Sequence, residues 1–139
     1  MPRSQLPQII KLSTKQMVRN AEASLRVLSI EEALSHHSRN DVTFIDLRDV
    51  REIAQTGRIK GARHVPRGML EFWIDPDSGY HKEVFSQDKT FVFYCASGLR
   101  SALAAKVAQD MGLSPVAHVA GGINAWIEAS GPIDPPKPG

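Results

Sequence analysis

Segments of strand length alternate along the chain with segments whose apolar residues recur at helical spacing. Four short runs are predicted to be strands, at residues 42–46, 62–65, 91–94 and 116–119. A helix is predicted after the third run, from a stripe made of Leu103, Ala104, Val107, Ala108 and Met111. This alternation predicts an α/β fold, with a mainly parallel central sheet and helices on both of its faces.

Local signals predict where several helices begin and end. Ser13 and Ser29 each begin a Ser-x-x-Gln or Ser-x-x-Glu pattern, which is typical of a capping box. Asp49 is expected to cap a helix that reaches about residue 55 and ends at Gly57. The first helix is expected to pack on the domain or on a partner through a stripe made of Met17, Val18, Ala21 and Leu25.

Length and composition are those of one module. The chain has 139 residues, of which 42% are hydrophobic, enough for a single compact core. We expect an N-terminal helical extension over residues 1–27, one domain over residues 28–132 and a proline-rich tail over residues 133–139. The tail is expected to be an extended, solvated chain end, because Pro132 just before it and Pro135, Pro136 and Pro138 within it end the last helix and favour an extended chain.

Charge and cysteine content restrict the environment of the protein. The 17 Lys and Arg residues are scattered among 15 acidic residues, so we expect no nucleic-acid surface. An early apolar run of signal-peptide or membrane-spanning length is missing, so we expect no membrane association and a cytoplasmic location. The single cysteine excludes an intrachain disulfide, and a reducing compartment would keep it available as a thiol.

The sequence predicts neither a metal site nor a cofactor. The five histidines lack paired metal-ligand spacing, so surface positions or core packing account for them, at positions 36, 37, 64, 81 and 118. Asp75, Asp77 and Gly79 suggest a calcium loop, but the glycine is fifth where an EF-hand needs it sixth. Gly121-Gly122 lacks the other glycines of a phosphate-binding fingerprint.

The only cysteine, Cys95, lies where the strand at 91–94 meets the helix that follows. The loop between them is short enough for its backbone N–H groups to surround the sulfur, with a helix N-terminus behind it. Such a site favours the thiolate, which is the reactive form. The alternative is that Cys95 is a small buried hydrophobic residue at the end of a strand.

Five motifs in register resemble those of the single-domain rhodaneses, a family of sulfurtransferases. They are Asp46-Leu47-Arg48, Gly57 to Ala62, His64-Val65-Pro66, the six-residue loop from Cys95 to Arg100, and Gly121-Gly122 followed by Trp126. The similarity runs from about residue 28 to residue 132. It implies a rhodanese-like α/β domain and an enzyme of sulfur metabolism.

The resemblance also implies a mechanism. Cys95 would take sulfane sulfur from thiosulfate or a persulfide donor, form a persulfide, and pass the sulfur to a thiol, cyanide or a protein acceptor. The loop that would hold the persulfide consists of Ala96, Ser97, Gly98, Leu99, Arg100 and Ser101. Backbone N–H groups and the charge of Arg100 would stabilise the anion there.

Four further residues are candidates for a supporting role. Asp46 and Arg48 either form an ion pair that fixes a loop or face the sulfur site. Arg67 either contacts a substrate anion or is an ordinary solvated arginine. Trp73 lies in an aromatic segment, residues 69–85, that forms either a wall of the donor pocket, a docking surface, or a small core under a long loop.

Departures from the family pattern leave alternatives open. Arg58 stands where a histidine is common, and Ala96 and Leu99 are neutral where some thiosulfate-using relatives carry basic residues. One alternative is a related phosphatase or arsenate reductase, although that chemistry places five residues between cysteine and arginine and four lie between Cys95 and Arg100. The other alternative is a docking or regulatory module that keeps the fold without turnover.

Overall fold

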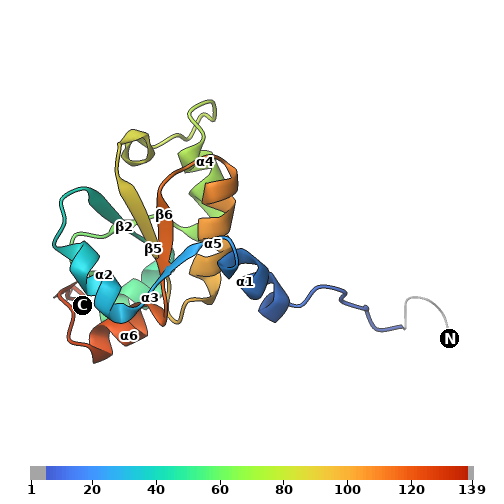
Figure 1. Ribbon diagram of the computed structural model, residues 1–139, viewed down its shortest axis with the longest axis horizontal. Helices are drawn as coiled ribbons and strands as arrows, with labels where there is room; N and C mark the ends of the chain where they lie inside the picture. Colours follow the sequence, from blue (N-terminus) through green and yellow to red (C-terminus); the bar gives the residue numbers. More distant parts are fainter. Residues whose placement is uncertain (1–5, 138–139) are drawn as a thin grey trace.

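Five parallel strands form the central sheet, in the order β1-β6-β5-β2-β4 (Figure 1). The protein is represented by a computed structural model that describes residues 6–137. In chain order the elements are α1 (Thr14–Glu22), β1 (Arg26–Leu28), α2 (Ile30–His37), β2 (Val42–Asp46), α3 (Val50–Thr56), β3 (Arg58–Ile59), β4 (Arg63–His64), η2 (Arg67–Met69), α4 (Leu70–Ile74), η3 (Glu83–Ser86), β5 (Thr90–Tyr94), α5 (Leu99–Asp110), β6 (Val116–Val119), α6 (Gly122–Glu128) and β7 (Ile133–Asp134). The predicted α/β class and the mainly parallel sheet are confirmed.

Helices cover both faces of the sheet, and β5 contributes to the core on each face. Phe91 and Phe93 pack in a cluster with α1, α4 and α5, whereas Val92 and Tyr94 pack in a second cluster with α2 and α6. Figure 1 shows these two groups of helices on opposite faces of the sheet. This alternation follows from the two-residue period of a strand. Because both faces of β5 are buried, its sequence is a continuous apolar run.

Helix α5 approaches the sheet through small side chains. Its buried residues are Ser101, Ala102, Ala104, Ala105 and Ala108. The predicted stripe is therefore wrong at its end, because Met111 lies beyond the helix and is exposed. Helix α5 buries a broad band of small residues instead of a narrow stripe of large ones, and alanines contrast too little with polar residues for hydrophobic periodicity to mark the helix end.

Several local predictions are confirmed by hydrogen bonds. Strand β2 has the predicted bounds. The Ser29 hydroxyl accepts the N–H of Glu32 at 3.1 Å, and the Glu32 carboxylate accepts the N–H of Ser29 at 3.0 Å, which completes the capping box. Asp49 caps α3, which ends at Gly57 with a φ of 75°.

Two helix predictions and one strand prediction need correction. Ser13 caps α1 through the N–H of Gln16, but the Gln16 amide donates to Asn20, so only half of the capping box forms. Helix α1 ends at Glu22, and Leu25 lies after it as a buried residue that follows an exposed turn. The strand predicted at 62–65 is limited to β4, which pairs with β2 over two residues.

The segment after α6 is held to the domain instead of being a solvated end. Strand β7 pairs antiparallel with β3, and the carbonyl of Pro132 accepts the indole N–H of Trp126 at 2.8 Å. Asp134 also accepts the N–H of Gly61 at 2.9 Å. The prediction of a free tail is therefore wrong at Ile133 and Asp134; Pro138 lies outside the described residues.

Helix α1 packs on α5 and contributes Ala21 to the core, so the first of the two predicted packing alternatives holds. Residues 6–13, which precede α1, extend away from the rest of the molecule (Figure 1). Strand β1 begins at Arg26, so the sheet starts inside the segment predicted as an extension. The predicted domain boundaries stay a prediction. Between residues 6 and 137, the structure contains no helix long and apolar enough to cross a membrane.

Candidate active site at the Cys95 loop

Cys95 follows the last residue of the central strand β5, and its side chain is only 1% exposed. The sulfur accepts the backbone N–H of Gly98 at 3.2 Å and that of Ser101 at 3.4 Å. Gly98 has a φ of 104°, a left-handed conformation that turns the loop back toward the sulfur just before α5 begins. The loop therefore directs two backbone donors at Sγ, as an anion-binding nest does.

The start of α6 holds this loop from the other side. The N–H of Ile123 donates to the carbonyl of Cys95 at 2.9 Å, and the N–H of Asn124 donates to the carbonyl of Ala96 at 3.1 Å. Gly122 lies so close that a Cβ there would overlap both carbonyl groups, and its φ is 57°. This close approach explains why a glycine occupies the second position of Gly121-Gly122.

The pKa of the Cys95 thiol is set by burial and by these hydrogen bonds. Burial raises the pKa, but the Ser101 hydroxyl and the N–H groups of Ser101, Gly98 and Ser97 lower it more. The result is a pKa below the ordinary value for a cysteine. The loop therefore increases the thiolate fraction near neutral pH.

The loop side chains point to different environments. Ser101 is fully buried and its hydroxyl lies 3.6 Å from Cys95 Sγ, whereas Ser97 and Leu99 are exposed. Leu99 and Arg100 line a mainly apolar groove between α1 and α5, together with Thr14, Lys15, Val18 and Leu103. Two residues of the cysteine loop, Leu99 and Arg100, therefore also belong to this groove, whereas Cys95 does not line it.

Ser101 also connects the cysteine to two residues that the sequence did not suggest. Its hydroxyl lies 3.0 Å from Nδ1 of His118, and His118 Nε2 lies 2.8 Å from the Glu22 carboxylate. His118 is 1% exposed, on β6. The only sequence signal for it is a histidine inside an otherwise apolar strand, and that pattern predicts no more than a surface position or core packing.

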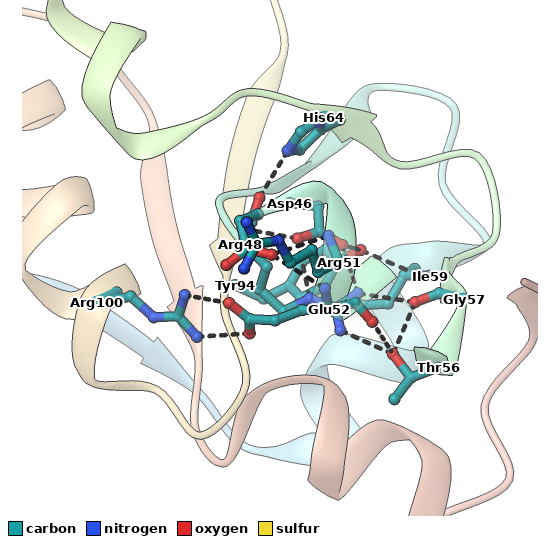
Figure 2. A network of polar contacts seen from close by, with 11 residues as sticks. Asp46, Arg48, Arg51, Glu52, Thr56, Gly57, Ile59, His64, Tyr94 and Arg100 are labelled. Carbon is teal, nitrogen blue, oxygen red and sulfur yellow. Dashed lines mark hydrogen bonds and ion pairs between the residues drawn. The ribbon is translucent and has the colours of Figure 1, made fainter. Parts of the chain in front are cut away.

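Arg100 is paired with a carboxylate. Its guanidinium makes hydrogen bonds of 2.7 and 2.8 Å to the two oxygens of Glu52, on α3 (Figure 2). This contact raises the pKa of Arg100 and lowers the pKa of Glu52. The Glu52 carboxylate thus largely offsets the positive charge predicted to face a persulfide.

Asp46 and Arg48 form a buried ion pair at 2.8 Å, with exposed fractions of 0% and 1% (Figure 2). Arg48 also donates to the Thr56 hydroxyl at 2.8 Å and to the Gly57 carbonyl at 2.7 Å. The pair therefore joins the end of β2 to the end of α3. Of the two alternatives for these residues, the geometry favours the loop-fixing one.

Tyr94 extends this network to β3. Its hydroxyl donates to Asp46 at 2.6 Å and accepts the N–H of Ile59 at 3.1 Å. Burial and the neighbouring carboxylate raise the pKa of Tyr94 far above its usual range. His64 contacts the backbone of this network and not its charged groups, because its Nε2 lies 2.6 Å from the Arg48 carbonyl oxygen (Figure 2).

The other two candidates have local partners. Arg67 pairs with Glu71 at 2.9 Å, four residues along the chain. Trp73 packs against the core, and Lys82 lies 5.1 Å from the centre of its ring. Leu70, Ile74, Val84 and Phe85 are buried, so the 69–85 segment forms part of the main core. Among the residues that the structure describes, no cluster of His, Cys, Asp and Glu could hold a metal ion.

Comparison with known proteins identifies a family and several relatives that this chain resembles. The rhodanese-like domain family matches residues 29–129. The probable adenylyltransferase/sulfurtransferase MoeZ of Mycobacterium tuberculosis is 34% identical over 95 residues, which are 68% of this chain and 22% of MoeZ. The human thiosulfate:glutathione sulfurtransferase is 27% identical over 76% of this chain and 96% of its own length. The chain thus spans only about a fifth of MoeZ, one of its most similar relatives.

Solved structures share the fold of this chain. A protein of unknown function from Rhodopseudomonas palustris, described as a "possible tyrosine phosphatase", is 53% identical with a TM-score of 0.90, over 93% of this chain and 99% of its own. The polysulfide-sulfur transferase homodimer of Wolinella succinogenes is 30% identical with a TM-score of 0.67, over 86% of this chain and 85% of its own.

Proposed function

This chain belongs to the rhodanese-like domain family, and from that membership we propose that it is a sulfurtransferase that carries sulfane sulfur as a persulfide on Cys95. The observation that carries the proposal is the pair of N–H groups, from Gly98 and Ser101, that point at Sγ. The same donors would stabilise the thiolate before the reaction and an anionic persulfide after it. Relatives named sulfurtransferases support the general reaction class.

The proposed reaction has two displacement steps. The Cys95 thiolate attacks the outer sulfur of the donor, a sulfur–sulfur bond forms, and the donor's own sulfur–sulfur bond breaks. Thiosulfate would leave as sulfite, and a persulfide donor would leave as a thiolate. An acceptor thiolate or cyanide then attacks the terminal sulfur, and Cys95 leaves as the thiolate that began the cycle.

The charges beside the loop favour a donor of low charge. Arg100 is already bound by Glu52, and the neighbouring loop positions Ala96 and Leu99 are neutral. A thiosulfate dianion would have to compete with the Glu52 carboxylate for Arg100, whereas a monoanionic persulfide needs less positive charge. We therefore propose low-molecular-weight persulfides as the better donors and thiosulfate as a usable one.

Intact mass spectrometry tests the proposal. The purified protein is incubated with thiosulfate or a low-molecular-weight persulfide and then with cyanide, beside a Cys95→Ser variant. We expect a gain of one sulfur atom that cyanide removes and that the variant does not show. No gain from either donor, in a folded protein with a free thiol, would contradict the proposal and favour a docking module without turnover.

A second candidate, phosphatase activity, rests on the description of the Rhodopseudomonas palustris protein. The loop geometry argues against it, because four residues separate Cys95 from Arg100 and the guanidinium is turned to Glu52 (Figure 2). Hydrolysis of an aryl phosphate by the purified chain, lost in Cys95→Ser, would establish this activity. We expect none above the level of the Cys95→Ser variant.

A further inference from the structure

A continuous chain of hydrogen-bonding groups runs from the cysteine to the surface of α1. Ser101 Oγ lies 3.6 Å from Cys95 Sγ and 3.0 Å from His118 Nδ1, and His118 Nε2 lies 2.8 Å from Glu22 Oε2. Four elements meet in this chain, namely the end of β5, α5, β6 and α1. The first three side chains are at most 1% exposed, whereas Glu22 is 36% exposed.

The geometry points to a proton-transfer chain in which the proton of the Cys95 thiol passes through Ser101 to His118, which Glu22 orients through Nε2, so that helix α1 is coupled to the reactivity of the cysteine. Ser101 touches the reacting sulfur, and His118 and Glu22 act through it as positioning residues. This inference rests on the proposed function, because it concerns how the nucleophile of that reaction is generated.

The direction of each hydrogen bond follows from the chemistry of Glu22. An ionised carboxylate only accepts, so Nε2 of His118 carries a proton. In the neutral imidazole Nδ1 is then an acceptor, which takes the hydroxyl proton of Ser101 and leaves Oγ to accept from the Cys95 thiol. The tautomer needed to receive a proton from Ser101 is thus fixed by a residue on another helix.

The transfer balances without any external reactant. The thiol proton passes to Ser101 Oγ while the Ser101 hydroxyl proton passes to His118 Nδ1. The products are a Cys95 thiolate and a His118 imidazolium, and Ser101 is unchanged. When the reaction cycle returns Cys95 as a thiolate, the same two protons move back from His118 through Ser101, which restores the thiol and the neutral imidazole.

The surroundings of His118 make this chain depend on Glu22. Burial lowers the pKa of His118 and the Glu22 carboxylate opposes that effect. The titratable groups that face the imidazole are Glu22 from α1 and, through Ser101, Cys95 from the end of β5. Its neighbours on the adjacent strands, Val27 of β1 and Phe93 of β5, carry no charge. A buried imidazolium would therefore find its compensating charge in Glu22 and in the thiolate itself.

The decisive variant is Glu22→Gln, which does not touch Cys95. Its side-chain carbonyl can still accept the Nε2 proton, so a purely structural role in anchoring α1 would be preserved. The readout is the pH profile of Cys95 alkylation by iodoacetamide, and the control is Glu31→Gln on α2, which exchanges another exposed glutamate. We expect the apparent thiol pKa to rise in Glu22→Gln alone, so that alkylation at neutral pH slows by about threefold to tenfold. A profile that coincides with the wild type would overturn the proton-transfer chain.

A reciprocal measurement does not depend on how well Glu22→Gln folds. Because the thiolate favours the imidazolium, the NMR titration midpoint of His118 should be lower in Cys95→Ser than in the wild type. Equal midpoints would also overturn the inference. The mass-spectrometric test of sulfur gain distinguishes a failure of the sulfurtransferase function from a failure of the proton-transfer chain. A protein that never gains sulfur, but in which the pKa of Cys95 and the titration midpoint of His118 shift as expected, would lack the proposed function and keep the proton-transfer chain.

Discussion

Arg100, at the start of α5, donates two hydrogen bonds from its guanidinium group to the carboxylate of Glu52 on α3, one to each oxygen. The pair holds the cation beside the cysteine loop in the absence of substrate. A donor that uses Arg100 must therefore displace Glu52 or share the guanidinium with it. This relationship gives the first prediction.

Glu52→Gln should improve the use of thiosulfate. Removal of the carboxylate charge frees Arg100 for the donor, and exposed ion pairs contribute about 0.2–1 kcal/mol, so we expect KM for thiosulfate to fall by up to about fivefold. Steady-state kinetics with thiosulfate and with a monoanionic persulfide provide the measurement. The effect should be larger for the dianion; an unchanged KM for both donors would show that Arg100 does not contact them.

Removal of one partner of the Asp46–Arg48 pair should destabilise the fold strongly. Arg48→Met leaves a buried carboxylate without its cation, which costs about 3–5 kcal/mol in the free energy of unfolding. Urea denaturation measures this loss. The double variant Asp46→Leu with Arg48→Met should recover part of it, because no unpaired charge remains; equal losses in the single and double variants would show that shape, not charge, dominates here.

Gly122→Ala should lower both the stability of the fold and the rate of Cys95 alkylation, by more than its left-handed backbone conformation alone would cause. The added Cβ would overlap the carbonyls of Cys95 and Ala96, whereas a Cβ at Gly61, whose φ is 80°, meets open space. Gly61→Ala is thus the matched control, which we expect to cost about 1–2 kcal/mol in stability and leave Cys95 alkylation unchanged. Gly122→Ala should cost more and slow alkylation; equal effects of the two substitutions would contradict the close-contact explanation.

The lowered pKa of Cys95 should make stability depend on pH with a definite sign. The native thiol ionises at lower pH than the unfolded one, so the unfolded chain binds more protons between the two pKa values. Stability relative to Cys95→Ser should therefore rise with pH across that window, by up to about 1.4 kcal/mol per unit of pKa difference. This added stability should be lost as the pH falls through the pKa of the Cys95 thiol in the folded protein. Urea titrations at several pH values provide the test, and a difference that does not vary with pH would mean that the thiol is not shifted.

The features predicted best from sequence are those that depend on near neighbours in the chain. Strand β2 is an apolar run closed by a polar residue, and Ser29 and Asp49 cap their helices through residues two or three positions away. The position of Cys95 at the end of β5 follows from the same local reasoning. Such signals survive folding because burial and capping act over a few residues.

The features that sequence reasoning missed depend on contacts between distant segments. His118 and Glu22 lie 96 positions apart, and Arg100 and Glu52 lie 48 apart, so no local pattern marks either pair. The proline content around Ile133 favoured a solvated chain end, but pairing with β3 and the contact between Trp126 and Pro132 outweigh that tendency. Helix α4 is five residues long, too short for hydrophobic periodicity to reveal.

The hydrogen bonds from Ile123 and Asn124 to the carbonyls of Cys95 and Ala96 also bear on dynamics. The loop cannot open without breaking bonds to the first turn of α6, so the two should fluctuate as one cooperative unit. The amides of Gly98 and Ser101 would then exchange their hydrogens with solvent only when α6 detaches. If Cys95 carries a persulfide as proposed, its outer sulfur would become accessible to bulk reductants only when α6 detaches, so the docking of α6 would set the lifetime of that persulfide.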